Sequence, residues 1–268
     1  SKYNIYNKLW LKEQQEKGMV PGNLISKWEN RQSSAELKDL GIPFDFAKPT
    51  NLIKYIIEIA RVNESDIVMD FFAGSGSVGH AVYKYNIENC SNLRCILVQL
   101  PELLSRENKE QKQAYDFCVK YKKSFSIAEL TKERLRRAGA KVSADNPDWQ
   151  GDTGFRVFKL DTSNIRPWSA DAASLDAQMQ ASLSPLLEDR SQDDVMTELL
   201  LKRGIDLSVR LEVRDFDGLR VTCAGNGMLF TCLESHIPAS SIEALASGLT
   251  TWHRELAFNI ESKLVMSS

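Results

Sequence analysis

The sequence predicts an α/β protein, with an incomplete doubly wound, Rossmann-like parallel sheet followed by a small α+β domain. An apolar segment at 66–70 leads into a glycine-rich turn and a helical string, and a second apolar run follows at 95–100. Both runs are too short for helices, and strand, helix, strand in one sheet gives a right-handed crossover. Farther on, short strands at 208–214, 219–223 and 228–233 are joined by Asp217-Gly218 and Gly225-Asn226-Gly227, which are typical of hairpins.

The segment before the first strand divides near residue 46. Residues 1–45 are polar and aromatic without a sustained period, so we interpret them as a helix followed by extended segments, the remnant of a preceding region. A helical period then begins after Pro49, which stands where a first-turn proline is tolerated. The residues that predict this amphipathic helix are Leu52, Ile53, Ile56, Ile57 and Ala60.

The run at 95–100 has the unbroken apolar form of a parallel strand covered on both faces. A charged helix is predicted from about 124 to 137, ending at Gly139, and loop residues at 145–148 mark a boundary. Alternation predicts a strand at 155–160, and 170–187 is predicted to be a surface helix or loop. Ser191 is the expected N-cap of a helix through Leu201 that ends at Gly204.

Composition excludes several functional classes. The 268 residues contain no apolar run of the roughly 20 residues that a membrane span needs, so we expect a cytoplasmic protein with no membrane contact. Five cysteines without paired spacing and three scattered histidines argue against disulfides, a structural metal or a metal hydrolase. A net charge of −2 gives no footprint of nucleic-acid binding, and we interpret the basic stretch at 120–141 as a solvated helical face.

The glycine turn is the main candidate site. Residues 74–79 match GxGxxG, which fits a tight turn without a ligand, a dinucleotide site, or another nucleoside site at a helix N-terminus. The strand ends in Asp70, whose carboxylate would repel a pyrophosphate but can meet the ammonium of a methionine moiety. Phe72 can pack on an adenine, and the amides of 73–76 can approach the amino-acid end. These residues favour S-adenosylmethionine (AdoMet).

The chain also resembles a known family, the beta-class amino-methyltransferases, in their cofactor-binding half. Three segments carry the likeness in that family's order and spacing: Phe46-Ala47-Lys48-Pro49-Thr50-Asn51-Leu52-Ile53, Asp70-Phe71-Phe72-Ala73-Gly74-Ser75-Gly76, and Ile96-Leu97-Val98-Gln99-Leu100-Pro101-Glu102. Segments at 153–161 and 198–204 resemble that family's C-terminal region. The chain is most similar to modification subunits of type III restriction systems, which methylate adenine at N6 in DNA.

This resemblance implies the residues of an AdoMet site. In the family, the Lys-Pro helix start and the FxGxG turn hold the cofactor together. The implied cofactor residues are Lys48, Pro49, Asp70, Phe72, Ala73, Gly74, Ser75 and Gly76. Related enzymes place an acidic residue at the ribose, where this chain has Gln99, with Glu102 as the possible substitute.

The resemblance also divides the chain by role. It implies a remnant of a target-recognition or linker region at 1–45, an AdoMet-binding domain at 46–148 and a small α+β domain for dimerisation or subunit contact at 149–268. The family's catalytic Asp/Asn-Pro-Pro-aromatic loop has no counterpart, because no two prolines are adjacent. We therefore expect no catalytic residue here, a fragment that does not methylate DNA alone, and DNA, a restriction subunit and a second copy as partners.

Two other interpretations stay open. The chain can be a docking module for a nuclease-helicase partner, with a glycine turn that binds nothing. It can also be a nicotinamide oxidoreductase, which predicts binding of NAD instead of AdoMet.

Overall fold

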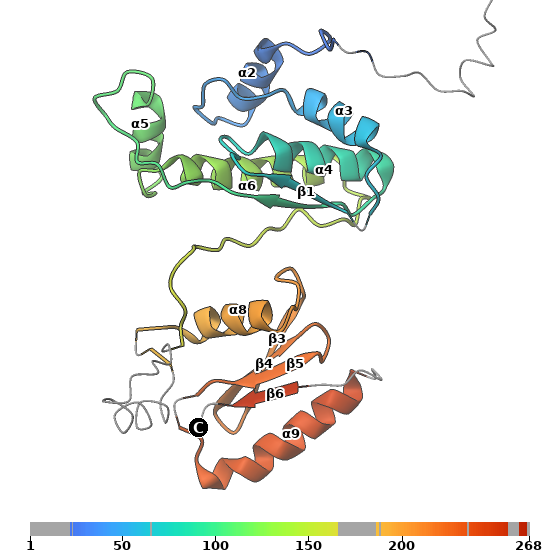
Figure 1. The fold of residues 1–268 in the computed structure, drawn as a ribbon, viewed down its shortest axis with the longest axis vertical. Coiled ribbons are helices and arrows are strands. Elements are labelled where there is room, and N and C mark those ends of the chain that lie inside the picture. The colour runs from blue at the N-terminus through green and yellow to red at the C-terminus, as the bar shows by residue number, and fades with distance from the viewer. Residues whose placement is uncertain are drawn as a thin grey trace, which may run out of the picture. The chain divides into compact units, whose positions relative to one another are not determined.

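The chain forms two compact units that divide between Phe155 and Arg156 (Figure 1). The computed structural model describes residues 22, 24–64, 66–165, 186–187, 189–234, 236–256 and 263–266. The helix expected near the N-terminus and residues 170–185 of the segment expected to be a surface helix or loop lie outside the described residues. Within the described part, no helix is both long and apolar enough to cross a membrane.

The first unit contains the predicted strand, turn, helix and strand. Strand β1 (Ile67–Asp70) leads through the glycine turn into helix α4 (Ser77–Asn89), and strand β2 (Arg94–Leu97) pairs with β1 in parallel, with Met69 opposite Ile96. The other helices are α2 (Asn30–Asp39), α3 (Thr50–Ala60), α5 (Lys112–Lys120) and α6 (Ile127–Asp145). This order confirms an α/β arrangement.

The two-stranded sheet is covered on one face. Val68 and Cys95 pack with α3 and α4, whereas Ile67, Met69 and Ile96 are 46–47% exposed. The expectation that the second strand is covered on both faces is therefore wrong for the described residues. Parallel sheets usually bury both faces, so an apolar surface remains open here.

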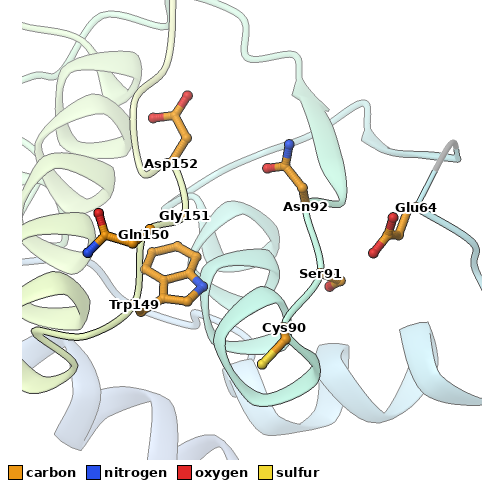
Figure 2. A pocket seen from close by; sticks show the side chains of 8 residues that line it. All are labelled: Glu64, Cys90, Ser91, Asn92, Trp149, Gln150, Gly151 and Asp152. Carbon is orange, nitrogen blue, oxygen red and sulfur yellow. The ribbon is translucent and has the colours of Figure 1, made fainter.

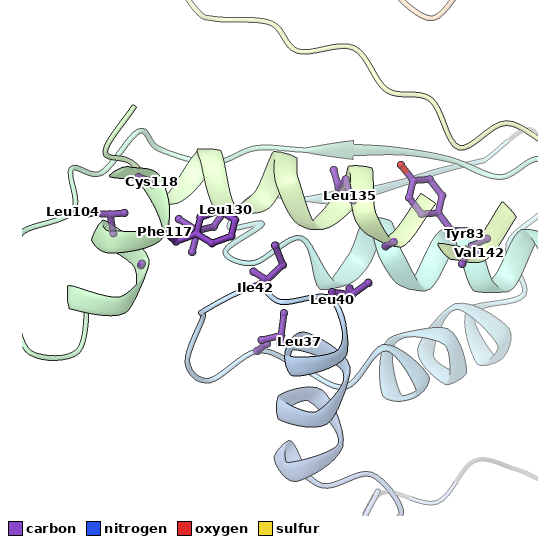
Figure 3. Packing of buried hydrophobic residues seen from close by; sticks show 13 residues of the cluster. Leu37, Leu40, Ile42, Tyr83, Leu104, Phe117, Cys118, Leu130, Leu135 and Val142 are labelled. Atoms are coloured by element: carbon purple, nitrogen blue, oxygen red, sulfur yellow. The ribbon is translucent and has the colours of Figure 1, made fainter. Parts of the chain in front are cut away.

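The core of this unit joins segments that are far apart in the sequence (Figure 3). Leu37, Leu40 and Ile42 pack with α5 and α6, with Phe117 and Leu130 among their partners. Each such leucine contributes about 1.5–3 kcal/mol by leaving water. Residues 37–42 are thus held in the same core as α4, which follows the glycine turn, and α6.

Two further sequence predictions fail in this unit. Helix α2 forms where an extended segment was expected, because Leu37 faces the common core and Ser33 Oγ donates to the Ala47 carbonyl at 2.6 Å. Helix α6 does not end at Gly139 but continues to Asp145. A Cβ at Gly139 would lie 3.0 Å from Thr153 Cβ, so this glycine serves close packing and not helix termination.

The basic stretch along α6 is largely neutralised. Glu133 pairs with Lys123, Arg136 and Arg137, and Lys132 pairs with Glu129. The expected solvated face is therefore an ion-pair face. Arg134 departs from this pattern, because its side chain is completely buried.

The second unit is a four-stranded sheet between two helices. Its strands β3 (Leu211–Phe216), β4 (Leu219–Ala224) and β5 (Leu229–Cys232) form the predicted antiparallel meander, and β6 (Lys263–Met266) adds to β5 in parallel. Helix α8 (Gln192–Lys202) packs on one face and helix α9 (Ile242–Glu255) on the other, as their separate core clusters show. Trp252, fully buried, anchors α9.

Local signals around α8 are confirmed, and one strand prediction is wrong. Ser191 caps α8 in a capping box with Asp194, and Gly204 follows its end with φ +66°. Residues 155–160 form no strand, and Leu160 is completely exposed. Alternation fits a pleat, but a strand exists only where a neighbour completes its hydrogen-bond ladder.

Candidate functional site

The glycine turn lies at the carboxyl end of β1, where parallel sheets bind ligands. Gly74 and Gly76 adopt left-handed conformations, with φ +50° and +80°, which side chains disfavour. Gly76 caps α4, whose first turn receives no side-chain cap. The turn therefore presents a helix N-terminus without a capping side chain, an arrangement suited to a polar or anionic group.

Asp70 and Phe72 stand at the start of this turn. Asp70 Oδ1 accepts the Phe72 N–H at 3.0 Å, which fixes the carboxylate beside the backbone bend. Phe72 is 83% exposed, although aromatic side chains usually bury most of their surface. Ala73, in contrast, is buried. An exposed ring next to an anchored carboxylate offers a stacking face and a negative charge to the same ligand.

Gln99 braces the turn from the end of β2. Its Oε1 accepts the Gly74 N–H at 2.7 Å, and its Nε2 donates to the Leu100 carbonyl at 3.1 Å. The side chain predicted to contact a ribose is thus engaged with the protein. Glu102 is exposed, and only its carbonyl has a described role, accepting the Ile127 N–H.

The Lys-Pro segment approaches the turn through its neighbours. The Phe44 ring lies 3.6 Å from the position of a Gly74 Cβ, four residues before Lys48. Lys48 is exposed, while Pro49 is fully buried and forms the N-cap of α3. The structure therefore brings the Phe44 side chain, four residues before Lys48, to the turn.

A buried polar network connects the start of α3 with α4. Thr50 Oγ1 donates to Glu36 Oε1, and Lys84 Nζ donates to Glu36 Oε1 at 2.9 Å and to Thr50 Oγ1 at 2.8 Å. Burial raises the pKa of Glu36, but hydrogen bonds from Lys84 and Thr50 more than offset it and leave a net lowering. The carboxylate is thus ionised at neutral pH and ties the two helices together.

Arg134 extends this network to the glycine turn from α6. Its side chain is 0% exposed, and Nη1 donates to Ser75 Oγ at 2.5 Å and to Ser77 Oγ at 2.8 Å. Nη2 lies 3.7 Å from Glu36 Oε2. Burial lowers the pKa of Arg134 to about 10, so it stays protonated at neutral pH. Thr131, one turn earlier, donates through Oγ1 to the Gly74 carbonyl.

Sequence reasoning missed Glu36, Thr131 and Arg134. A signal for Arg134 exists, because it lies on the apolar stripe of α6, between Leu130 and Ala138 at helical spacing. A cation on such a stripe is buried and needs a partner. The partners come from distant segments, which no local pattern indicates.

His80 lies next to this network on α4, with 4% exposure. Burial, followed by the positive charges of Lys84 and Arg134, lowers the pKa of His80 to about 3. The ring is therefore neutral at physiological pH, and its Nδ1 has no hydrogen-bond partner within the described residues. A neutral histidine leaves the charge of the network to Glu36, Lys84 and Arg134.

A separate hollow of about 390 Å³ lies at the other end of the sheet (Figure 2). Glu64 and Asn92, which come just before β1 and β2, line it with Trp149 and Asp152. The hollow therefore lies at the amino ends of the two strands, whereas the glycine turn lies at their carboxyl ends. The hollow contains none of the predicted cofactor residues.

The chain is similar to known DNA-modifying proteins. A family model described as DNA methylase matches residues 2–135, half of the chain. The StyLTI modification (Mod) subunit of a type III restriction-modification enzyme from Salmonella typhimurium is 35% identical over 135 residues, which cover 50% of this chain and 19% of that protein. The EcoP15I Mod subunit from Escherichia coli is 35% identical over 136 residues, covering 49% and 18%, and the EcoPI Mod subunit from Escherichia phage P1 is 32% identical over 136 residues, covering 49% and 19%.

The matched region contains the whole carboxyl edge described above. It includes both strands, the glycine turn and the network from Glu36 to Arg134. The chain spans less than a fifth of the length of these curated relatives. On the family match and the resemblance that it confirms, this chain belongs to the DNA methylase family.

Proposed function

We propose that this chain supplies the AdoMet-binding part of a type III modification methyltransferase, which methylates adenine N6 in DNA. The observation that carries the proposal is the glycine turn at the carboxyl edge of β1, opened by Asp70 and flanked by the exposed Phe72 ring. The incomplete Rossmann-like topology fits this role, because nucleosides bind at that edge of parallel sheets. The relatives are named as Mod subunits of type III enzymes, which supports the reaction class.

The residues present fit AdoMet. Gly74 and Gly76 adopt the left-handed conformations that form the turn, and α4 begins there without a side-chain cap. Asp70 provides a negative charge for the ammonium, and Phe72 a ring for the adenine. Lys48 is exposed on the segment that reaches the turn, and Ala73 and Ser75 complete the turn's wall.

In this proposal the chain binds and orients the methyl donor. AdoMet supplies an electrophilic methyl group when it is bound. Asp70 holds the amino-acid end, Phe72 covers the adenine, and the brace from Gln99 to Gly74 keeps the turn in shape. Such prior positioning lowers the entropic part of a transfer barrier. The residues that orient the target adenine belong to a catalytic loop that this sequence does not contain.

Titration calorimetry tests the proposal directly. The chain should bind AdoMet, and Asp70→Asn should weaken the binding about tenfold or more, since a buried or partly buried charge contact contributes about 1.5–3 kcal/mol. Asp66→Asn is the matched control, because it removes the same charge at the amino end of β1, where Asp66 bonds only Asn63 among described partners. Absence of AdoMet binding at millimolar ligand, or NAD binding in its place, would refute the proposal.

Partners follow from the same family assignment. We propose that the intact protein acts on DNA and assembles with a restriction subunit, as the names of the relatives suggest. The open face of β1 and β2, with Ile67, Met69 and Ile96, favours association of this chain with itself. A homodimer is the simplest closed arrangement for such contacts.

A further inference from the structure

Arg134 occupies a place that neither stability nor the sequence motif explains well. A fully buried guanidinium is expensive to desolvate, and here its Nε and Nη2 lack hydrogen bonds within the described residues. Its two good hydrogen bonds go to Ser75 and Ser77, the residues on either side of Gly76. The cation therefore lies directly behind the glycine turn.

The charges around it do not balance. Lys84 and Arg134 both pair with the single carboxylate of Glu36, and the neighbouring His80 is neutral at physiological pH. This group of four residues, the turn network, carries one positive charge in excess. In a poorly solvated site an excess charge acts over several ångströms and favours a negative group nearby.

The buried serine hydroxyls link this charge to the glycine turn. Because Arg134 Nη1 donates to both oxygens, each serine hydroxyl must use its own proton elsewhere. The two oxygens are 3.2 Å apart, so one hydroxyl donates to the other, and the second has its proton left for another acceptor. Together with the start of α4, the turn is arranged to favour an anion.

We propose that Arg134 is a positioning residue that makes the turn selective for the carboxylate of the ligand's amino-acid moiety, while Asp70 faces its ammonium. This inference rests on the proposed function, since it assigns the two ends of a zwitterion to two opposite charges. Arg134 acts through Ser75 and Ser77 and does not touch the ligand, because it is not exposed. Neither charge is required by a ligand that lacks the amino acid.

Two ligands separate this role from a structural one. S-adenosylhomocysteine carries the zwitterionic amino acid, whereas 5'-methylthioadenosine is a similar thioether nucleoside without it. Arg134→Gln should weaken S-adenosylhomocysteine binding about tenfold, the scale of one charged hydrogen bond, and change 5'-methylthioadenosine binding less than about twofold. Arg134→Lys keeps the positive charge but loses the planar guanidinium that donates to both serines, so it should recover part of the lost affinity.

Glu36→Gln is a second variant with the opposite expected sign. It removes the neutralising carboxylate and leaves Arg134 in place, so S-adenosylhomocysteine should bind more tightly than in the wild type. Circular dichroism confirms folding of each variant, and Glu36→Gln keeps the proposal testable if Arg134→Gln does not fold. Equal losses for both ligands in Arg134→Gln, or an unchanged or weaker S-adenosylhomocysteine complex in Glu36→Gln, would overturn the inference. A wild-type chain that binds neither ligand would instead overturn the proposed function and this inference with it.

Discussion

Replacement of Gly76 by alanine tests whether the turn needs this glycine. Alanine at φ +80° costs about 1 kcal/mol or slightly more in backbone strain. The new Cβ would also lie 3.2 Å from Thr131 Cγ2, so α6 or the turn must move by a few tenths of an ångström. Overpacking of this kind adds about 1 kcal/mol or more. We expect Gly76→Ala to lower the free energy of unfolding by about 2–3 kcal/mol and to weaken AdoMet binding.

The matched control is Gly204→Ala. Gly204 has φ +66°, and a Cβ there would meet no atom within 4 Å, so this change carries the backbone strain alone, about 1 kcal/mol. Urea denaturation followed by circular dichroism gives both free energies. Adding Thr131→Ser to Gly76→Ala should recover the packing term, because serine lacks the methyl group but keeps the hydroxyl that bonds Gly74. Equal destabilisation by the two glycine replacements, or no recovery in the double variant, would refute the steric argument.

Three further outcomes are expected. Phe72→Ala should change the free energy of unfolding by less than about 0.5 kcal/mol, since the ring is 83% exposed, but weaken AdoMet binding severalfold in calorimetry; an unchanged affinity would remove the ring from the site. The buried His80 binds a proton in the unfolded chain below its ordinary pKa of 6.5 but in the folded chain only near 3, so stability should fall with decreasing pH below 6.5, by up to about 1.4 kcal/mol per unit. The charges of Lys84, Arg134, Glu36 and Lys141 all act on the ring. Carboxylates with lowered pKa, such as Glu198, add to the slope towards pH 5, so His80→Gln should reduce the slope between pH 6.5 and 5 without removing it, and an unchanged slope in urea titrations of that variant would contradict the assignment. Light scattering after size exclusion should show self-association through the open sheet face, and a monomer at high concentration would argue against it.

Local patterns predicted most of the elements near the site. The glycine turn and the strands around it each depend on residues within a few positions of one another, and so does the cap at Ser191 in the second unit, so the sequence contains their full signal. The same holds for the hairpins of the second unit.

Predictions failed where distant contacts decided the outcome. The alternation at 155–160 lacks a pairing neighbour among the described residues, and Gly139 lies inside a helix that continues to Asp145, with Val142 packed in the core. The link from Glu36 to Arg134 spans about a hundred residues of sequence and becomes visible only in the folded chain. Residue types and spacing indicated the turn, but not the buried Arg134 side chain that donates hydrogen bonds to Ser75 and Ser77.

The location of the bound nucleoside tests the central claim most directly. In ¹⁵N NMR spectra titrated with AdoMet, the amides of Ala73, Gly74 and Gly76 should shift, together with that of Gln99. The amides of the hollow at the opposite end of the sheet, at 90–92 and 149–152, should not. Shifts confined to the hollow, with the glycine turn unchanged, would contradict the account.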